Sequence, residues 1–123
     1  MRLKPPKFIR WLMPDLIWEM KDRSAVYLTF DDGPTPGITE WILSTLDKYD
    51  AKATFFVLGK NVEMYPDLYQ RILDAGHRVG NHTYSHQKGW GMSLERYTED
   101  VDFANDLVHS ELFRPCLLYT SDA

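Results

Sequence analysis

The chain has 123 residues, of which 44% are hydrophobic and 26% are charged. This length suits one domain, and the composition excludes a disordered, collagen-like or low-complexity protein. A net charge of −4 offers no basic surface for nucleic acid. The single cysteine, Cys116, excludes an internal disulfide and a cysteine-rich zinc site. A metal ion in this chain would therefore be bound by histidine and carboxylate side chains.

Residues 1–24 predict an amphipathic lead-in to the domain. Their most apolar stretch, residues 8–20, contains Arg10 and is interrupted by Pro14, and no small-residue cleavage site follows it. This pattern argues against a signal peptide, and against a transmembrane segment, which needs roughly 18 apolar residues. We expect the lead-in to pack on the domain, with contact to a membrane surface as the alternative, and we expect a cytoplasmic location.

Strand-like and helical segments alternate from residue 25 onward. Residues 25–30 are rich in β-branched and aromatic side chains and predict a buried strand. Apolar residues then recur at helical spacing, with Thr35 as the expected N-cap and Trp41 on the expected core face. Residues 53–58 carry apolar side chains on both faces of the expected strand, which is typical of a parallel strand covered by helices.

The same alternation continues through the second half of the chain. Residues 66–75 predict a helix, and residues 77–81 predict a third strand. Ser93 is expected to cap a long helix, and residues 111–114 predict the start of a fourth strand. The expected core residues of these two helices are Leu68, Ile72, Leu73, Leu94, Tyr97, Val101, Ala104 and Val108. The order of elements predicts an α/β fold with a parallel sheet, in which active sites lie at the carboxyl ends of strands.

Two adjacent carboxylates, Asp31 and Asp32, follow the first predicted strand. Asp, Gly and Pro are ordinary turn formers, so this segment alone is well explained as a turn. Neighbouring side chains diverge, however, so one carboxylate can bind a cation while the other acts on what the cation holds.

Two histidines, His82 and His86, follow the third predicted strand. On a helical turn their Cβ atoms would lie about 5–6 Å apart, which suits two imidazoles on one metal ion. A lone pair at this spacing is equally well explained by two surface histidines. Together with one carboxylate, however, two imidazoles form a three-ligand site that leaves a position for water. The coincidence of both groups at strand ends favours the metal site.

Four other residues are weaker candidates. His77 is expected to be structural, and His109 is expected to be solvated on a helix. Trp90 lies beside the histidine motif and is expected either to stack on a sugar or to cover the core. Cys116 has no partner base in the sequence and is not expected to be a nucleophile.

Four segments together resemble the polysaccharide deacetylases of the NodB-homology type, carbohydrate esterase family 4. They are residues 29–34 (TFDDGP), 53–57 (ATFFV), 80–86 (GNHTYSH) and 112–115 (LFRP). The resemblance covers most of the chain from about residue 25 to 115. It implies a distorted (β/α) barrel with parallel strands, and we expect a partial barrel that is truncated at the fourth strand.

The resemblance also implies a function and a set of site residues. Members of this family are metal-dependent hydrolases that remove acetyl groups from N-acetylated or O-acetylated polysaccharides such as chitin oligomers or peptidoglycan. Asp31 resembles the catalytic base, Arg114 the arginine that orients it, and Asp32, His82 and His86 the metal ligands. We expect a divalent cation, with zinc as the default, although cobalt, nickel or iron would also fit these ligands. The polymer, the acetyl linkage and the oligomeric state stay open.

The sequence departs from the family pattern after Pro115. A second proline, an aromatic residue and a glycine are expected there, whereas residues 116–123 read CLLYTSDA. The later block that carries the general-acid histidine is absent. We therefore interpret residues 25–115 as the N-terminal part of a deacetylase domain and residues 116–123 as an atypical tail, from a frameshift or an assembly artefact. Such a fragment is expected to be inactive or very weak, with its general acid beyond the end of this chain.

Two other classes of function fit part of the pattern. A non-catalytic carbohydrate-binding or metal-binding module would keep the site without turnover; the truncation favours it, and the complete set of ligands and base disfavours it. A redox Fe(II) protein can also use two histidines and one carboxylate. The sequence shows no signal for the cosubstrate pocket that such a protein usually needs.

Overall fold

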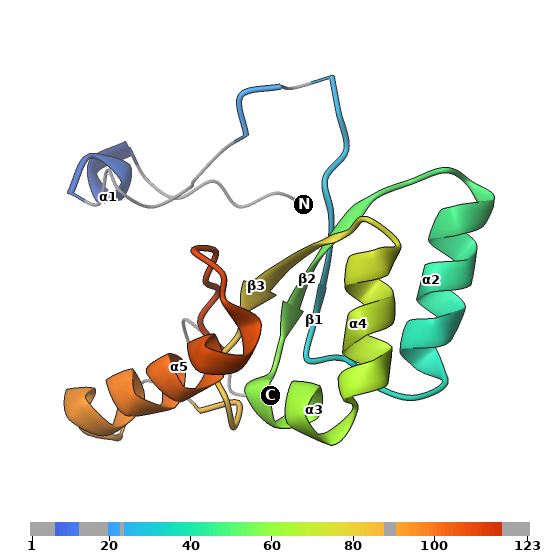
Figure 1. Cartoon of the computed structure of the whole chain (residues 1–123). Helices are drawn as coiled ribbons and strands as arrows, with labels where there is room; N and C mark the ends of the chain where they lie inside the picture. The colour runs from blue at the N-terminus through green and yellow to red at the C-terminus, as the bar shows by residue number, and fades with distance from the viewer. Residues whose placement is uncertain (1–6, 13–19, 23, 88–90, 117–123) are drawn as a thin grey trace, which may run out of the picture.

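The computed structural model describes residues 7–12, 20–22, 24–87 and 91–116. Within them, three strands form a parallel sheet in the order β1-β2-β3 (Figure 1). The strands are β1 (Leu28–Asp31), β2 (Ala53–Val57) and β3 (Arg78–Asn81). This arrangement confirms the predicted α/β class with parallel strands.

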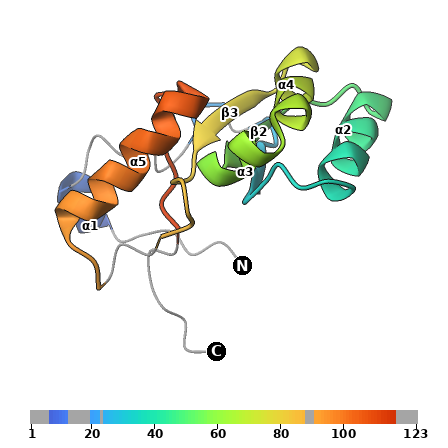
Figure 2. The same ribbon diagram turned by 60° about the horizontal axis from the view of Figure 1, so that its bottom comes forward.

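Helices connect the strands and cover one side of the sheet. They are α1 (Lys7–Leu12), α2 (Ile38–Lys48), α3 (Gly59–Met64), α4 (Pro66–Asp74) and α5 (Leu94–Val108). Helices α2 and α4 lie side by side on this side of the sheet (Figures 1 and 2), and the C-terminal end of α5 packs into the core on the same side through Val108. Helix α3 was not predicted, because its six residues are too few to show a helical repeat.

The main core lies between the sheet and helices α2 and α4. Strand β2 is central and carries buried side chains on both of its faces, as its apolar sequence predicts: Phe55 and Val57 on one face and Phe56 on the other. Val57 and Ile72 are fully buried, and such a side chain stabilises the fold by roughly 1.5–3 kcal/mol. The other buried residues of this cluster are Leu43, Leu46, Ala53, Val62, Tyr69 and Val108.

The prediction of a buried first strand is wrong. Three of the four residues of β1 are exposed, and Leu28 is 42% exposed. The reason is that β1 lies at the edge of the described sheet and pairs only with β2. A β-branched and aromatic composition predicts a strand, but it does not say whether that strand is central or at an edge.

The N-cap of one helix and the exposure of several helical side chains differ from the prediction. Gly37, not Thr35, is the N-cap of α2, and its N–H donates to the Glu40 side chain. Trp41 is 68% exposed because the buried face of α2 carries Thr39 and residues 43 and 46, and a step of two residues turns a helix by about 200°. Two further expected core residues, Leu73 and Leu94, are exposed, whereas Leu68, Ile72, Ala104 and Val108 are buried.

The predicted start of a fourth strand lies beside β3. Asn81 forms a parallel bridge with Phe113, its N–H donates to the Leu112 carbonyl at 2.8 Å, and its carbonyl accepts from the Arg114 N–H at 3.0 Å. Within the described residues this contact is a single bridge and not a strand. The fold is therefore a partial (β/α) barrel, as predicted.

The lead-in shows little contact with the domain at the positions where its side chains are described. Trp11 is 79% exposed and Leu12 is 63% exposed, so the prediction that the lead-in packs on the domain is wrong for these two residues. Among the described residues, no helix combines the length and the apolar character needed to cross a membrane.

Gly80, in β3, is closely surrounded by side chains of neighbouring segments. A Cβ at this position would lie 2.6 Å from two ring carbons of Phe56 and 3.2 Å from the Leu112 Cβ. We expect Gly80→Ala to lower the free energy of unfolding by about 1–3 kcal/mol, measured by chemical denaturation. The double variant Gly80→Ala/Phe56→Leu should recover part of this loss because the smaller side chain makes room. Equal stability of Gly80→Ala and the parent would contradict this packing.

His77 makes stability depend on pH. Burial, followed by the nearby Lys52 charge, holds the pKa of His77 below its ordinary value of 6.5, and its Nδ1 accepts the Ala53 N–H at 3.2 Å. Below this ordinary value the unfolded chain binds more protons than the folded chain, so stability is lost as the pH falls from 6.5 toward the lowered pKa.

We therefore expect the melting temperature of His77→Gln to fall less than that of the parent when the pH is lowered from about 7.5 to 5.5. His109→Gln is the matched control, since His109 is exposed. An equal loss in all three proteins would show that His77 does not carry this dependence.

Candidate metal centre and active site

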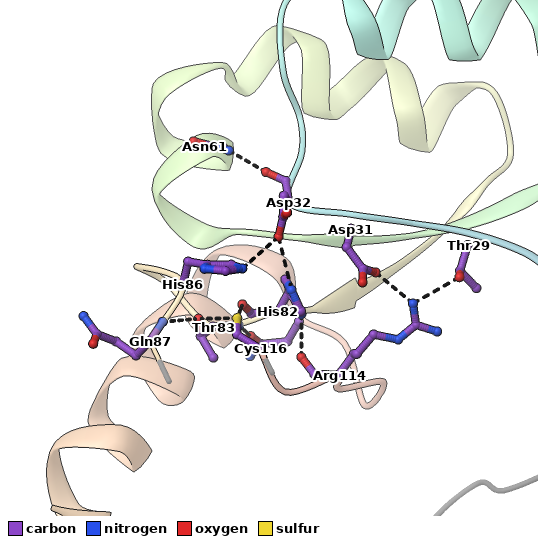
Figure 3. Close-up of polar contacts among 11 residues, drawn as sticks. Thr29, Asp31, Asp32, Asn61, His82, Thr83, His86, Gln87, Arg114 and Cys116 are labelled. Carbon is purple, nitrogen blue, oxygen red and sulfur yellow. Dashed lines mark hydrogen bonds and ion pairs between the residues drawn. The ribbon is translucent and has the colours of Figure 1, made fainter. Parts of the chain in front are cut away.

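The carboxyl edge of the sheet brings the predicted site residues together (Figure 3). Asp31 is the last residue of β1, and Asp32 follows it. His82 directly follows the last residue of β3. Because β1, β2 and β3 are parallel, these ends lie at one edge of the sheet.

Asp32 and the two histidines converge. The Asp32 Oδ1 atom lies 3.2 Å from His82 Nε2 and 3.1 Å from His86 Nε2. The two imidazole rings meet edge to face with their centroids 5.5 Å apart. The His82 side chain is 4% exposed, whereas those of His86 and Asp32 are 38% and 60% exposed. The group is therefore anchored on the protein side and open on the solvent side.

The other ring nitrogen of His82 fixes how this residue presents its donor atom. His82 Nδ1 lies 2.6 Å from the Arg114 carbonyl oxygen, which can only accept a hydrogen bond. Nδ1 therefore carries a proton, and Nε2 points toward Asp32. This arrangement is the one by which proteins orient a metal-binding histidine.

These donors fit a divalent metal ion. Ligand atoms at about 2.0–2.1 Å from a tetrahedral zinc ion lie roughly 3.3–3.4 Å from one another. The separations of 3.2 and 3.1 Å between Asp32 and the two histidines are close to this spacing. The exposed side of the group leaves a position for water or substrate.

The prediction that the histidines lie on a helical turn is wrong. Residues 82–87 are irregular, and both Thr83 (φ 70°) and His86 (φ 59°) have left-handed backbone conformations. Asp32 is left-handed too, at φ 74°. Such conformations cost on the order of 1–3 kcal/mol each in residues other than glycine, so they persist only where neighbours hold them. For Asp32, the Asn61 Nδ2 group donates to its carbonyl oxygen at 2.7 Å.

Asp31 faces away from the histidines and toward Arg114, as divergent neighbouring side chains predict. The Arg114 Nη1 group donates to Asp31 Oδ1 at 2.8 Å and to Thr29 Oγ1 at 3.0 Å. The guanidinium also lies over the Phe56 ring, 4.2 Å from its centroid. Three contacts thus fix one charged group beside Asp31.

Cys116 lies closer to the histidines than the sequence indicates. Its buried thiol lies within 4.8 Å of a ring nitrogen of each of His82 and His86, which makes it a third possible metal ligand. Burial raises the pKa of this thiol, and the thiol donates to the His82 carbonyl oxygen at 3.2 Å. The Asp32 Oδ1 atom lies 3.2 and 3.1 Å from the two histidine nitrogens, whereas the thiol is hydrogen-bonded to the His82 carbonyl, so Asp32 completes the donor set better than Cys116 does.

Two predictions fall outside the described residues. Trp90 lies in the segment 88–90, and most of the expected atypical tail lies in residues 117–123. The expectations about a stacking tryptophan and about the tail therefore stay predictions.

Comparison with known proteins identifies the family that the chain is similar to. Residues 19–116 match the family model described as "Polysaccharide deacetylase". The chain is 39% identical over 98 residues to the peptidoglycan-N-acetylmuramic acid deacetylase PdaC of Bacillus subtilis, covering 79% of this chain and 21% of PdaC. It is 40% identical over 89 residues to a chitooligosaccharide deacetylase of Rhizobium leguminosarum bv. trifolii, covering 72% of this chain and 41% of that protein.

Solved structures show the same fold. The structure of B. subtilis PdaC superposes with a TM-score of 0.72 at 38% identity, covering 78% of this chain and 50% of that one. A family 4 carbohydrate esterase from Streptomyces lividans, solved with acetate, gives a TM-score of 0.72 at 30% identity, covering 78% of this chain and 53% of that one. This chain thus spans about half of these two structures and less than half of both curated relatives. It belongs to the polysaccharide deacetylase family, carbohydrate esterase family 4.

Proposed function

We propose that this chain carries the metal-binding and proton-accepting parts of a deacetylase that removes acetyl groups from polysaccharides. The divergence of Asp31 and Asp32 is the observation that carries the proposal, because it separates a metal ligand from a base at one strand end. The names of the relatives support peptidoglycan or chitooligosaccharide as the class of substrate. Oligomeric state stays open, and the cytoplasmic location stays a prediction.

Asp32, His82 and His86 would hold the metal ion. The family is metal-dependent, and we propose zinc, although cobalt, nickel or iron suit the same donors. When bound, such an ion polarises the acetyl carbonyl and lowers the pKa of a bound water. The three side chains contribute one negative charge and two neutral nitrogens, and their open side lets the acetyl group approach.

Asp31 would act as the base in this proposal. Its carboxylate accepts the proton of the attacking water, and Arg114 holds that carboxylate in place through Oδ1. Thr29 and the Phe56 ring fix the guanidinium on its other sides. Arg114 thus orients the base and keeps it apart from the metal ligands.

The leaving amine also needs a proton, and among the described residues no histidine other than the proposed ligands lies at the site. All four histidines of the chain are described, and two of them are the proposed ligands. His77 precedes β3 and therefore lies at the amino ends of the strands, away from the site. Its ring accepts a hydrogen bond from the Ala53 N–H. His109 is the exposed C-cap of α5. We therefore propose that neither His77 nor His109 is the acid for amide cleavage.

This division of roles predicts a difference between two substrates. The leaving group of an activated ester such as 4-nitrophenyl acetate departs without being protonated. The amine that leaves when triacetylchitotriose is deacetylated must be protonated first. We expect the zinc-loaded chain to hydrolyse the ester and to release little acetate from the oligosaccharide. Asp31→Asn should lower the ester rate by about 10²–10⁴-fold.

Asp47→Asn is the control for this experiment, since Asp47 is exposed on α2. It should keep the parent rate. A chain that binds zinc and oligosaccharide but hydrolyses neither substrate would instead be a non-catalytic module.

Metal binding predicts a shift in stability. Zinc at a hundredfold excess over its dissociation constant should stabilise the folded chain by about 2.7 kcal/mol, seen as a higher melting temperature that a chelator reverses. His86→Ala should abolish the shift because it removes one of three ligands. His109→Ala, an exposed histidine outside the site, should keep it. A shift that survives in His86→Ala would place the zinc elsewhere.

A further inference from the structure

One acidic side chain that the proposed reaction does not use directly is hydrogen-bonded to the segment that carries both histidines. Asp100, on α5, accepts three hydrogen bonds from the two residues that precede His86. Its Oδ2 accepts from the backbone N–H groups of Tyr84 at 2.9 Å and Ser85 at 3.3 Å, and its Oδ1 accepts from the Ser85 hydroxyl at 2.7 Å. Asp100 is partly buried beneath this segment.

The segment needs such a partner because it belongs to no helix or strand. Its left-handed residues, Thr83 and His86, flank Tyr84 and Ser85 on either side. The backbone N–H groups of Tyr84 and Ser85 have no carbonyl partner among the described residues, so the Asp100 carboxylate takes the place of one. An ionised carboxylate only accepts hydrogen bonds, which suits a site with three donors.

Other contacts attach the same segment to α5 and to its own chain. The Asn81 side chain donates to the Val101 carbonyl at 2.9 Å and accepts the Thr83 N–H at 2.8 Å. The Tyr84 ring packs edge to face on Phe103, with the centroids 4.6 Å apart. These contacts do not involve Asp100, so the segment should stay on α5 when that carboxylate is changed.

The two histidines differ in how much support they have of their own. His82 is almost fully buried, and its Nδ1 is fixed by the Arg114 carbonyl. His86 is more exposed, and the ring contacts described for it are those with Asp32 and His82. The direction in which His86 points therefore depends on the backbone just before it.

We propose that Asp100 is a positioning residue for the metal centre: it holds the turn at Tyr84 and Ser85 so that His86 meets Asp32 and His82. The inference rests on the proposed function, since it concerns the same metal site. Changing the Asp100 carboxylate to an amide places an NH₂ group against donors and removes part of this support. His86 should then lose its fixed direction, whereas His82 should keep it.

The affinity for zinc tests this role directly. Zinc binding is measured by competition with a chromophoric chelator, using the full 123-residue chain. We expect Asp100→Asn to weaken zinc binding about 10–100-fold, the usual cost of losing a group that orients a metal ligand. Asp102→Asn makes the same charge change at an exposed position of α5 and should stay within about twofold of the parent.

A second variant and a metal-free readout separate positioning from folding. Ser85→Ala removes one of the three hydrogen bonds without changing a charge, and should weaken zinc binding by a smaller factor than Asp100→Asn. In the metal-free chain, nuclear magnetic resonance signals of the His86 ring should broaden or average in Asp100→Asn, while those of His82 stay unchanged. If Asp100→Asn fails to fold, Ser85→Ala alone decides the result.

The outcomes distinguish this inference from the function on which it rests. A parent chain that binds no zinc would overturn the proposed function. A parent that binds zinc, with Asp100→Asn and Ser85→Ala both as tight as Asp102→Asn, would overturn the role of Asp100 alone.

Discussion

The site depends on two adjacent carboxylates being held in opposite directions. Asp31 is still part of β1, so its side chain is placed by the strand and meets Arg114 at 2.8 Å. Asp32 has a left-handed backbone, which turns its carboxylate toward His82 and His86. If both carboxylates pointed the same way, one cation would bind both, and no base would remain.

The parallel sheet supplies the frame for this divergence, and side chains from other segments hold it. Pairing of β1 with β2 and of β2 with β3 fixes the two strand ends at one edge. Asn61, from α3, holds the Asp32 carbonyl. Asp100, from α5, holds the backbone before His86. Left-handed residues at the site, or the backbone beside them, are thus held by hydrogen bonds with side chains of two different helices.

The residues of the site could be predicted from the sequence, whereas much of their backbone conformation and exposure could not. Strands with helices between them show in residue type and spacing, and Asp32, His82 and His86 follow strand ends, so their convergence was predictable. The irregular turn at Thr83 was not, because a spacing of four residues fits both a helix and a loop. The exposure of Trp41 depends on which row of α2 meets the sheet. Asn61 follows the second strand at the same edge, which was an available signal, whereas Asp100 acts across 15 or 16 residues and leaves no local pattern.

X-ray absorption at the zinc edge of the zinc-loaded chain tests the central claim most directly, because it reports which atoms surround the ion. Two imidazoles and one carboxylate predict a first shell of nitrogen and oxygen at about 2.0–2.2 Å, with the outer-shell scattering of two histidine rings. The nearby Cys116 thiol makes the alternative specific. A sulfur scatterer at about 2.3 Å, or scattering from fewer than two imidazoles, would contradict the assignment of Asp32, His82 and His86 as the ligand set.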